Sequence, residues 1–264
     1  MSTEVARFDQ ELDKPVQALF EETDSVLIVN PPSAMFRTII KIATSFDDDR
    51  PDLQVLATSE VLKSSTEDFI LASQVADLVE QDLLELRTAT DIARSSLLVS
   101  DYKIVTVISL DTELTGLQSG DEELVENTQS AFFDAWEGGD SFSLRTPPLS
   151  RVRKTLREEL GDEVENDFMM VFDSVDTIPG EEDAFDEVAI ALLVGANNEI
   201  LLYDISKWGE DSGVASKATF SRIKTRLVDR GLIETEKEPI DVGRPRLRLL
   251  LVPDHLEDVE NLTV

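Results

Sequence analysis

Hydrophobic residues recur at helical spacing near the C-terminal end of the chain. Phe220, Ile223 and Leu227 are three and four positions apart, which places them on one side of a helix. Ser216 is well suited to cap the first turn of this helix, and Gly231 is well suited to end it. The pattern therefore predicts a helix between Ser216 and Gly231, with one face buried and the opposite face open to solvent.

Beyond this helix the hydrophobic period changes to two. Leu232 and Ile233 open a short apolar segment, and a later segment alternates arginine with leucine over residues 246–249. Alternation at period 2 is typical of a β-strand with one buried face, and the prolines and glycine between the two segments predict a turn. Two shorter helices are predicted upstream, over residues 183–196 and 200–208. This order of elements predicts a C-terminal winged helix-turn-helix domain.

The N-terminal half alternates strand-like and helix-like patterns. Residues 25–29 and 53–57 are short apolar segments typical of buried strands. Between them, Ser33 follows a two-proline break and can cap a helix that runs to about Thr44. A strand, a helix and a strand at this spacing predict a βαβ unit with parallel strands.

Further segments with helical or strand-like periodicity follow the same half of the chain. We expect helices over residues 5–20 and 66–89, a hairpin of two strands within residues 96–109, a turn over residues 116–121 and a helix over residues 122–136. Together with the βαβ unit, these elements predict an α/β N-terminal domain with a mixed or parallel sheet.

A stretch rich in glycine and proline, residues 138–148, marks the clearest change in composition. It predicts an α/β domain for dimerisation or effector sensing over residues 1–137, a linker with helices over 138–182, a winged-helix domain over 183–253 and an acidic tail over 254–264.

Charge is distributed very unevenly along the chain. The net charge is −31, and the 55 acidic residues are spread over the whole sequence. Such a composition is typical of proteins adapted to concentrated salt, so we predict a halophilic source. Residues 217–248 nevertheless hold nine basic and five acidic residues, which leaves 15 basic and 50 acidic residues elsewhere. A basic segment in so acidic a chain is best explained by anion binding, and its predicted shape suggests DNA.

The exposed face of the predicted helix supplies candidate base contacts. Arg222 and Arg226 can each form two hydrogen bonds with the edge of a guanine. Ser221 and Thr225 can reach bases or phosphates. These four residues lie opposite the apolar stripe at about 100° per residue.

Further cations and a hydroxyl surround this face. Lys217 and Thr219 lie at the helix N-terminus, where phosphates bind readily, and Arg230 lies at its other end. Arg244 and Arg246 flank a proline in the predicted turn, so this wing is expected to contact the minor groove or the DNA backbone.

Residues for common catalytic chemistry are scarce. The chain has no cysteine and one histidine, His255, so disulfides, thiolate sites and transition-metal sites are not expected. Neither a P-loop nor a Gly-x-Ser-x-Gly motif is present. We predict no cofactor and no enzymatic activity. With no apolar run of about 18 residues and no signal peptide in the sequence, we predict a cytoplasmic protein.

Two other functions stay open at this point. The loop of residues 30–33 precedes a helix N-terminus that could hold an anion such as a sugar phosphate, so residues 1–137 could form an enzyme or a sugar-phosphate-binding domain. Winged helices also pair with proteins, so the chain could instead be a protein-interaction adaptor.

The combination of a winged helix, an α/β N-terminal domain and strong acidity resembles a known family. Gly231-Leu232-Ile233, a charged hairpin and the turn of residues 243–246 are similar to the C-terminal part of haloarchaeal TbsP (TrmB suppressor) regulators. The resemblance implies a homodimeric transcription factor that binds promoter DNA of sugar and other central carbon metabolism genes. A dimer also suits operator geometry, because two recognition helices in successive major grooves lie about 34 Å apart. A metabolite effector is a further possible partner.

Overall fold

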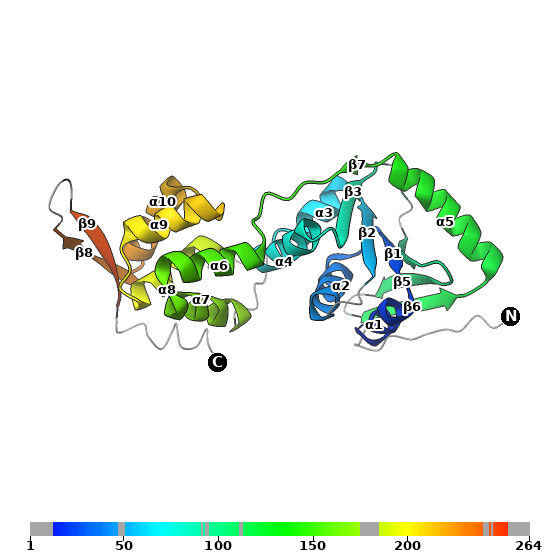
Figure 1. Ribbon diagram of the computed structural model, residues 1–264, viewed down its shortest axis with the longest axis horizontal. Coiled ribbons are helices and arrows are strands. Elements are labelled where there is room, and N and C mark those ends of the chain that lie inside the picture. The colour runs from blue at the N-terminus through cyan, green and yellow to red at the C-terminus, as the bar shows by residue number, and fades with distance from the viewer. Residues whose placement is uncertain are drawn as a thin grey trace. The chain divides into compact units, whose positions relative to one another are not determined.

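The computed structural model describes residues 13–46, 51–90, 92, 95–110, 113–174, 185–239, 243 and 245–252. The chain divides into two compact units (Figure 1), which are residues 1–67 with 71–145 and residues 68–70 with 146–264. Each unit has its own hydrophobic core. Among the helices described, none combines the length and the apolar character needed to cross a membrane.

A mixed sheet forms the centre of the first unit (Figure 1). Its strands in the described residues are β1 (Ser25–Val29), β2 (Asp52–Ala57), β3 (Leu84–Thr88), β4 (Ser96–Val99), β5 (Ile104–Leu110), β6 (Glu113–Ser119) and β7 (Asp140–Ser141). The order across the sheet is β6-β5-β4-β1-β2-β3-β7. β1, β2 and β3 run parallel, and the other strands pair antiparallel with their neighbours. The predicted βαβ unit, the hairpin and the mixed sheet are confirmed.

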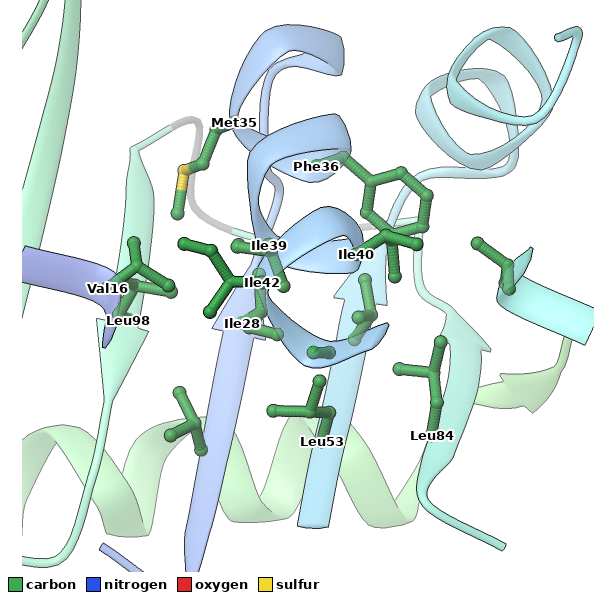
Figure 2. Close-up of a cluster of buried hydrophobic side chains, with 14 of the residues drawn as sticks. Val16, Ile28, Met35, Phe36, Ile39, Ile40, Ile42, Leu53, Leu84 and Leu98 are labelled. Carbon is green, nitrogen blue, oxygen red and sulfur yellow. The ribbon is translucent and has the colours of Figure 1, made fainter. Parts of the chain in front are cut away.

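Helices cover both faces of this sheet. They are α1 (Asp13–Glu22), α2 (Ser33–Ser45), α3 (Ser59–Ser65), α4 (Phe69–Glu80) and α5 (Glu122–Glu137). Because neighbouring side chains on a strand point to opposite faces, Ile28 lies in the same cluster as Ile39 and Ile42 of α2 (Figure 2), whereas Leu27 packs in a smaller cluster with Val125 of α5. The first face carries the larger core.

Two predictions for this unit are wrong. The expected long helix over residues 66–89 ends at Glu80, and the chain reverses at Asp82 (φ 58°) and continues as β3. The segment is a strand because β2 supplies backbone hydrogen-bond partners for a parallel neighbour, and its Leu84 and Leu86 are buried in the main core. The expected turn over residues 116–121 belongs mostly to β6, whose partner strand is β5.

The start of α2 also differs in detail from the expectation. Pro32, rather than Ser33, occupies the cap position of α2, and no side chain caps this helix. The expected first helix over residues 5–20 lies partly outside the described residues. Its described part is α1, Asp13–Glu22, which contains Pro15.

The second unit packs helices around one core and adds a small sheet. Its described elements are α6 (Leu149–Leu160), α7 (Asp162–Ser174), α8 (Glu187–Asn197), α9 (Leu202–Ser212), α10 (Lys217–Asp229), β8 (Ile233–Glu238) and β9 (Arg246–Leu251). β8 and β9 pair antiparallel and form the wing. Val152 of α6 and Phe168 of α7 are fully buried in the same core as Phe220 of α10. α6 and α7 therefore belong to the C-terminal unit rather than to a separate linker, and the units divide at residue 145 rather than at 137.

The helix-turn-helix depends on two glycines. Gly213 ends α9 with φ 85°, a left-handed conformation that glycine adopts without steric strain. Gly209 lies under the ring of Phe220, and a Cβ at this position would overlap that ring. The absent side chain lets α9 and α10 approach closely, so the crossing of these helices is fixed by a small residue facing a large one. The predicted winged helix-turn-helix is confirmed.

Candidate nucleic-acid interface

The sequence of α10 determines both its ends and its buried face. The Ser216 hydroxyl accepts a hydrogen bond from the backbone N–H of Thr219 at 3.2 Å and caps the first turn. Gly231 follows the helix with φ 73°. Phe220, Ile223 and Leu227 are buried, as their spacing predicted, so the opposite face of α10 is exposed.

The exposed face carries Ser221, Arg222 and Thr225. The Thr225 hydroxyl donates to the Ser221 carbonyl within the helix at 3.0 Å, so it is held close to the backbone. Within the part of the chain that the structure describes, Arg222 forms no ion pair with a carboxylate. Among the described residues, Arg222 is therefore the exposed cation of this face that no carboxylate holds.

One side of this face is turned toward the start of α8. Arg226 Nη2 lies 3.4 Å from Oδ2 of Asp186, which also caps α8, and both side chains are about two-fifths exposed. The guanidinium carbon of Arg230 lies 5.4 Å from the centre of the Phe185 ring. These two predicted contact residues therefore have partners within the protein, but they stay accessible.

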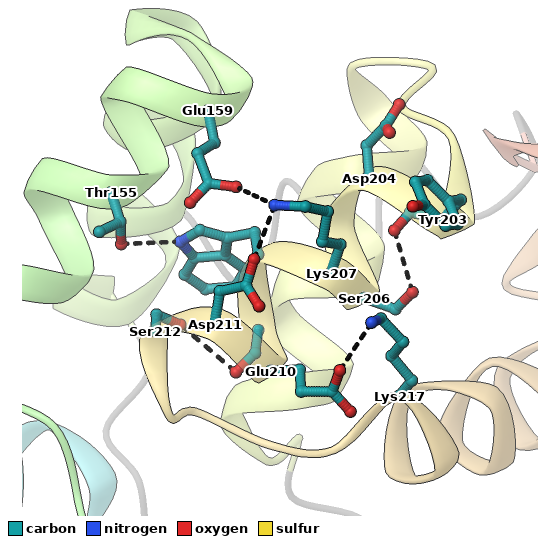
Figure 3. Close-up of polar contacts among 12 residues, drawn as sticks. Thr155, Glu159, Tyr203, Asp204, Ser206, Lys207, Glu210, Asp211, Ser212 and Lys217 are labelled. Carbon is teal, nitrogen blue, oxygen red and sulfur yellow. Dashed lines mark hydrogen bonds and ion pairs between the residues drawn. The ribbon is translucent and has the colours of Figure 1, made fainter.

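The other side of the face meets α9 (Figure 3). Lys217 Nζ lies 2.6 Å from Glu210 Oε2, and this hydrogen bond lowers the pKa of the Glu210 carboxyl and raises that of the Lys217 ammonium. One turn earlier on α9, Lys207 lies between Asp211 and Glu159 of α6. Two carboxylates hold Lys207, so Lys217 is the better placed of the two lysines to accept a phosphate.

Arg246 of the wing has partners on α9. Arg246 opens β9, with its guanidinium carbon 4.2 Å from the centre of the Tyr203 ring and Nη1 3.6 Å from Asp204 Oδ1. Arg246 pairs with Glu238 at the turn end of the ladder and is held against α9, because the Tyr203 ring and the Asp204 carboxylate both lie within its reach. Arg244 lies outside the described residues. Arg248, further along β9, donates to the Glu199 carbonyl and to Glu238.

These elements enclose a groove of about 440 Å³ between α9, α10 and the wing. Its polar lining comes from Tyr203, Ser206, Lys217, Ser221 and Arg246. Three of these residues were predicted from the sequence, whereas Tyr203 and Ser206 were not. Both lie on α9, whose amphipathic pattern is typical of a packing helix. The basic residue of this helix, Lys207, was not predicted as a contact and is held by Glu159 and Asp211.

Acidic partners offset much of the positive charge around the groove. Lys217, Arg226 and Arg246 each have a carboxylate within 4 Å, on α9 or at the start of α8. All three pairs are solvent-exposed, so each contributes little to stability and can exchange partners readily. These three cations are therefore already positioned to bind an anionic ligand once they leave their carboxylates. Arg222 has no carboxylate to leave among the residues described.

Comparisons with known proteins bear on both units. No curated protein matches the chain. One solved structure, described as that of TrmBL2, an archaeal chromatin protein with a novel mode of DNA binding, is 18% identical with a TM-score of 0.40, and the match spans 54% of each chain. Residues 4–147 match the N-terminal region of TbsP-like transcriptional regulators, and residues 148–264 match their C-terminal HTH domain. These two matches cover almost the whole sequence and meet within three residues of the division between the structural units. The chain therefore belongs to the TbsP-like family of transcriptional regulators.

Proposed function

We propose that this chain is a homodimeric, cytoplasmic regulator that inserts α10 into the major groove of promoter DNA. The observation that carries the proposal is the exposed face of α10, where Arg222 projects beside a groove lined by Lys217 and Arg246. In this arrangement Arg222 and Arg226 read base edges, with Ser221 and Thr225 beside them. Lys217, Thr219, Arg230, Arg244 and Arg246 contact the sugar-phosphate backbone and set the register of the helix.

The charge of the chain and its family resemblance support a more specific proposal for its source and its target genes. The net charge of −31 keeps a protein surface hydrated in concentrated salt, which favours a halophilic archaeon as the source. Near 1 M salt the Debye length is about 3 Å, so the acidic surface elsewhere hardly repels DNA and short-range groove contacts dominate binding. The resemblance to TbsP regulators favours central carbon metabolism genes as the targets. The N-terminal unit would then supply the dimer contacts, the effector site, or both.

Chromatin immunoprecipitation with sequencing, using the tagged full-length protein, tests this proposal most directly. Discrete occupancy upstream of genes for sugar breakdown or gluconeogenesis is expected, with a shared sequence motif of two half-sites about 34 Å apart. Light scattering of the purified protein should give the mass of two chains. Absence of chromosomal occupancy would favour a protein-interaction adaptor instead.

Removing the carboxylate that holds Lys217 should strengthen binding to DNA. In Glu210→Gln, Lys217 loses its 2.6 Å partner and a negative charge is removed beside the groove. We expect the dissociation constant for duplex DNA to fall about two- to fivefold in low salt, and the gain to shrink as salt rises. Fluorescence anisotropy with a labelled promoter fragment, measured over a series of salt concentrations, checks this.

Glu163→Gln provides a matched control for Glu210→Gln. It causes the same change in net charge from an exposed position on α7, where Glu163 has no ion-pair partner among the residues described. Equal gains in the two variants would show that overall charge, rather than the release of Lys217, controls affinity.

A further inference from the structure

A second groove, of about 480 Å³, lies in the first unit between the sheet and α5. Its volume falls within the range of about 300–1,000 Å³ that is typical of small-molecule sites. α5 is anchored near its two ends by Val125 and Trp136, which are buried, whereas Phe133 between them is 61% exposed. The groove therefore runs beside the middle of a helix that is attached to the sheet mainly near its ends.

Hydroxyl and amide groups line this groove from the sheet and from the helix. They belong to Ser25, Gln54, Ser100, Gln129 and Ser130. The Gln129 amide donates to the Ser100 carbonyl at 2.8 Å, which joins α5 to the end of β4. The side-chain amide of Gln54 has no hydrogen-bond partner among the residues described, although it is partly buried. Groups that can both donate and accept hydrogen bonds match the hydroxyls of a ligand.

Apolar and aromatic side chains complete the lining. Leu27 and Val99 form the floor on the sheet, and Phe133 and Trp136 form the wall on α5. The Arg87 guanidinium donates to the Trp136 carbonyl at 2.9 Å and lies 4.6 Å from the centre of the Trp136 ring, which fixes the orientation of this wall. An apolar wall facing hydroxyl and amide groups suits a small molecule with C–H surfaces and hydroxyls on the same ring or chain.

The charge of the lining narrows the class of ligand. No lysine or arginine is among the eleven described residues that line the groove. Arg87, which stacks on Trp136, is already paired with Glu85 and the Trp136 carbonyl, so a phosphate or carboxylate group would lack a ready counter-charge there. Asp101 and Glu126 are the two acidic members, a share no higher than the 55 acidic residues among 264 in the whole chain. The acids therefore reflect the general composition and are not a specific site for a cation.

We infer that this groove is the effector site and that it binds an uncharged, hydroxyl-rich small molecule. The role of the groove as an effector site rests on the proposed function, whereas ligand binding in the groove does not. A ligand here would contact the middle of α5 and the strands β1, β2 and β4 together. It would thus stabilise the packing of a helix that few buried side chains hold in place.

Isothermal titration calorimetry of the full-length protein tests the site with a defined panel. The uncharged probes are D-glucose, D-fructose, myo-inositol and glycerol, with glucose 6-phosphate as the anionic probe and spermidine as the cationic probe. We expect an uncharged probe to bind at least about tenfold more tightly than the charged ones, since a charged group would be desolvated without a partner. We expect Gln54→Met to weaken that binding at least about tenfold, because the amide hydrogen bonds are lost.

Gln81→Met is the matched control, because Gln81 is exposed just beyond α4 and does not line the groove. The assignment is overturned if no uncharged probe binds at about 10 mM, if a charged probe binds best, or if Gln54→Met binds as the parent does. Retardation of promoter DNA by the same preparations separates the two proposals. If the protein binds DNA but no probe, the effector-site proposal alone is refuted. If it binds a probe but no DNA, the proposed regulator function alone is refuted.

Discussion

Replacing Arg222 and Arg226 by alanine should abolish most sequence-specific DNA binding while leaving the fold intact. Each arginine is expected to contribute about 1–3 kcal/mol of specific affinity, because a bidentate contact with a guanine is lost. Both side chains are exposed on α10, so their removal leaves the buried face of the helix unchanged. Electrophoretic retardation of a promoter fragment identified by chromatin immunoprecipitation, at matched salt, measures the loss.

The two substitutions should differ when they are made singly. Arg222→Ala removes a side chain without an ion-pair partner in the described structure, whereas Arg226→Ala also releases Asp186 at the start of α8. We therefore expect Arg222→Ala to cost more binding. Arg145→Ala combined with Lys154→Ala removes two exposed positive charges that do not belong to α10 and serves as the control. If this control weakens binding as much as the double variant does, α10 is not the recognition helix.

Phe220→Ala should destabilise the C-terminal unit by about 3–5 kcal/mol, a large part of the stability of a typical domain. Phe220 is fully buried, and its ring fills the space above Gly209, so a cavity would open between α9 and α10. DNA binding should fall in parallel, because the position of α10 depends on this contact.

Each unit contains one tryptophan, which lets the effect of Phe220→Ala be assigned. Trp136 belongs to the first unit and Trp208 to the second, so urea unfolding followed by fluorescence in single-tryptophan variants reports each unit separately. Phe220→Ala should shift the Trp208 transition and leave that of Trp136 in place. Phe36→Ala, which removes an equally buried ring from the first unit, should do the reverse. Equal shifts of both transitions in either variant would contradict independent cores.

The helix α10 could be predicted from the sequence, whereas the strand β3 could not. In α10 the apolar stripe, the serine cap and the glycine stop agree, and the predicted helix matches the structure to within a residue at each end. Leu83 and Leu86 instead continued the apolar helical pattern expected over residues 66–89, and the strand that begins at Leu84 was missed. Over so short a segment, the spacing of the leucines fits the period of a helix as well as that of a strand. The strand that favours the second, β2, lies about 30 residues earlier in the sequence.

The sequence by itself determined the winged helix, the βαβ unit and the basic segment around α10, because each depends on local spacing, caps and composition. Tertiary structure alone decided which cations are held by carboxylates: Asp186, Asp204 and Glu210 come from other elements, and nothing in their local sequence links them to Arg226, Arg246 or Lys217. It also decided that Tyr203 and Ser206 line the groove between α9, α10 and the wing and that Gln54 and Trp136 line another. Contacts of this kind depend on how helices and strands pack, and packing brings together residues that no periodicity within one segment connects.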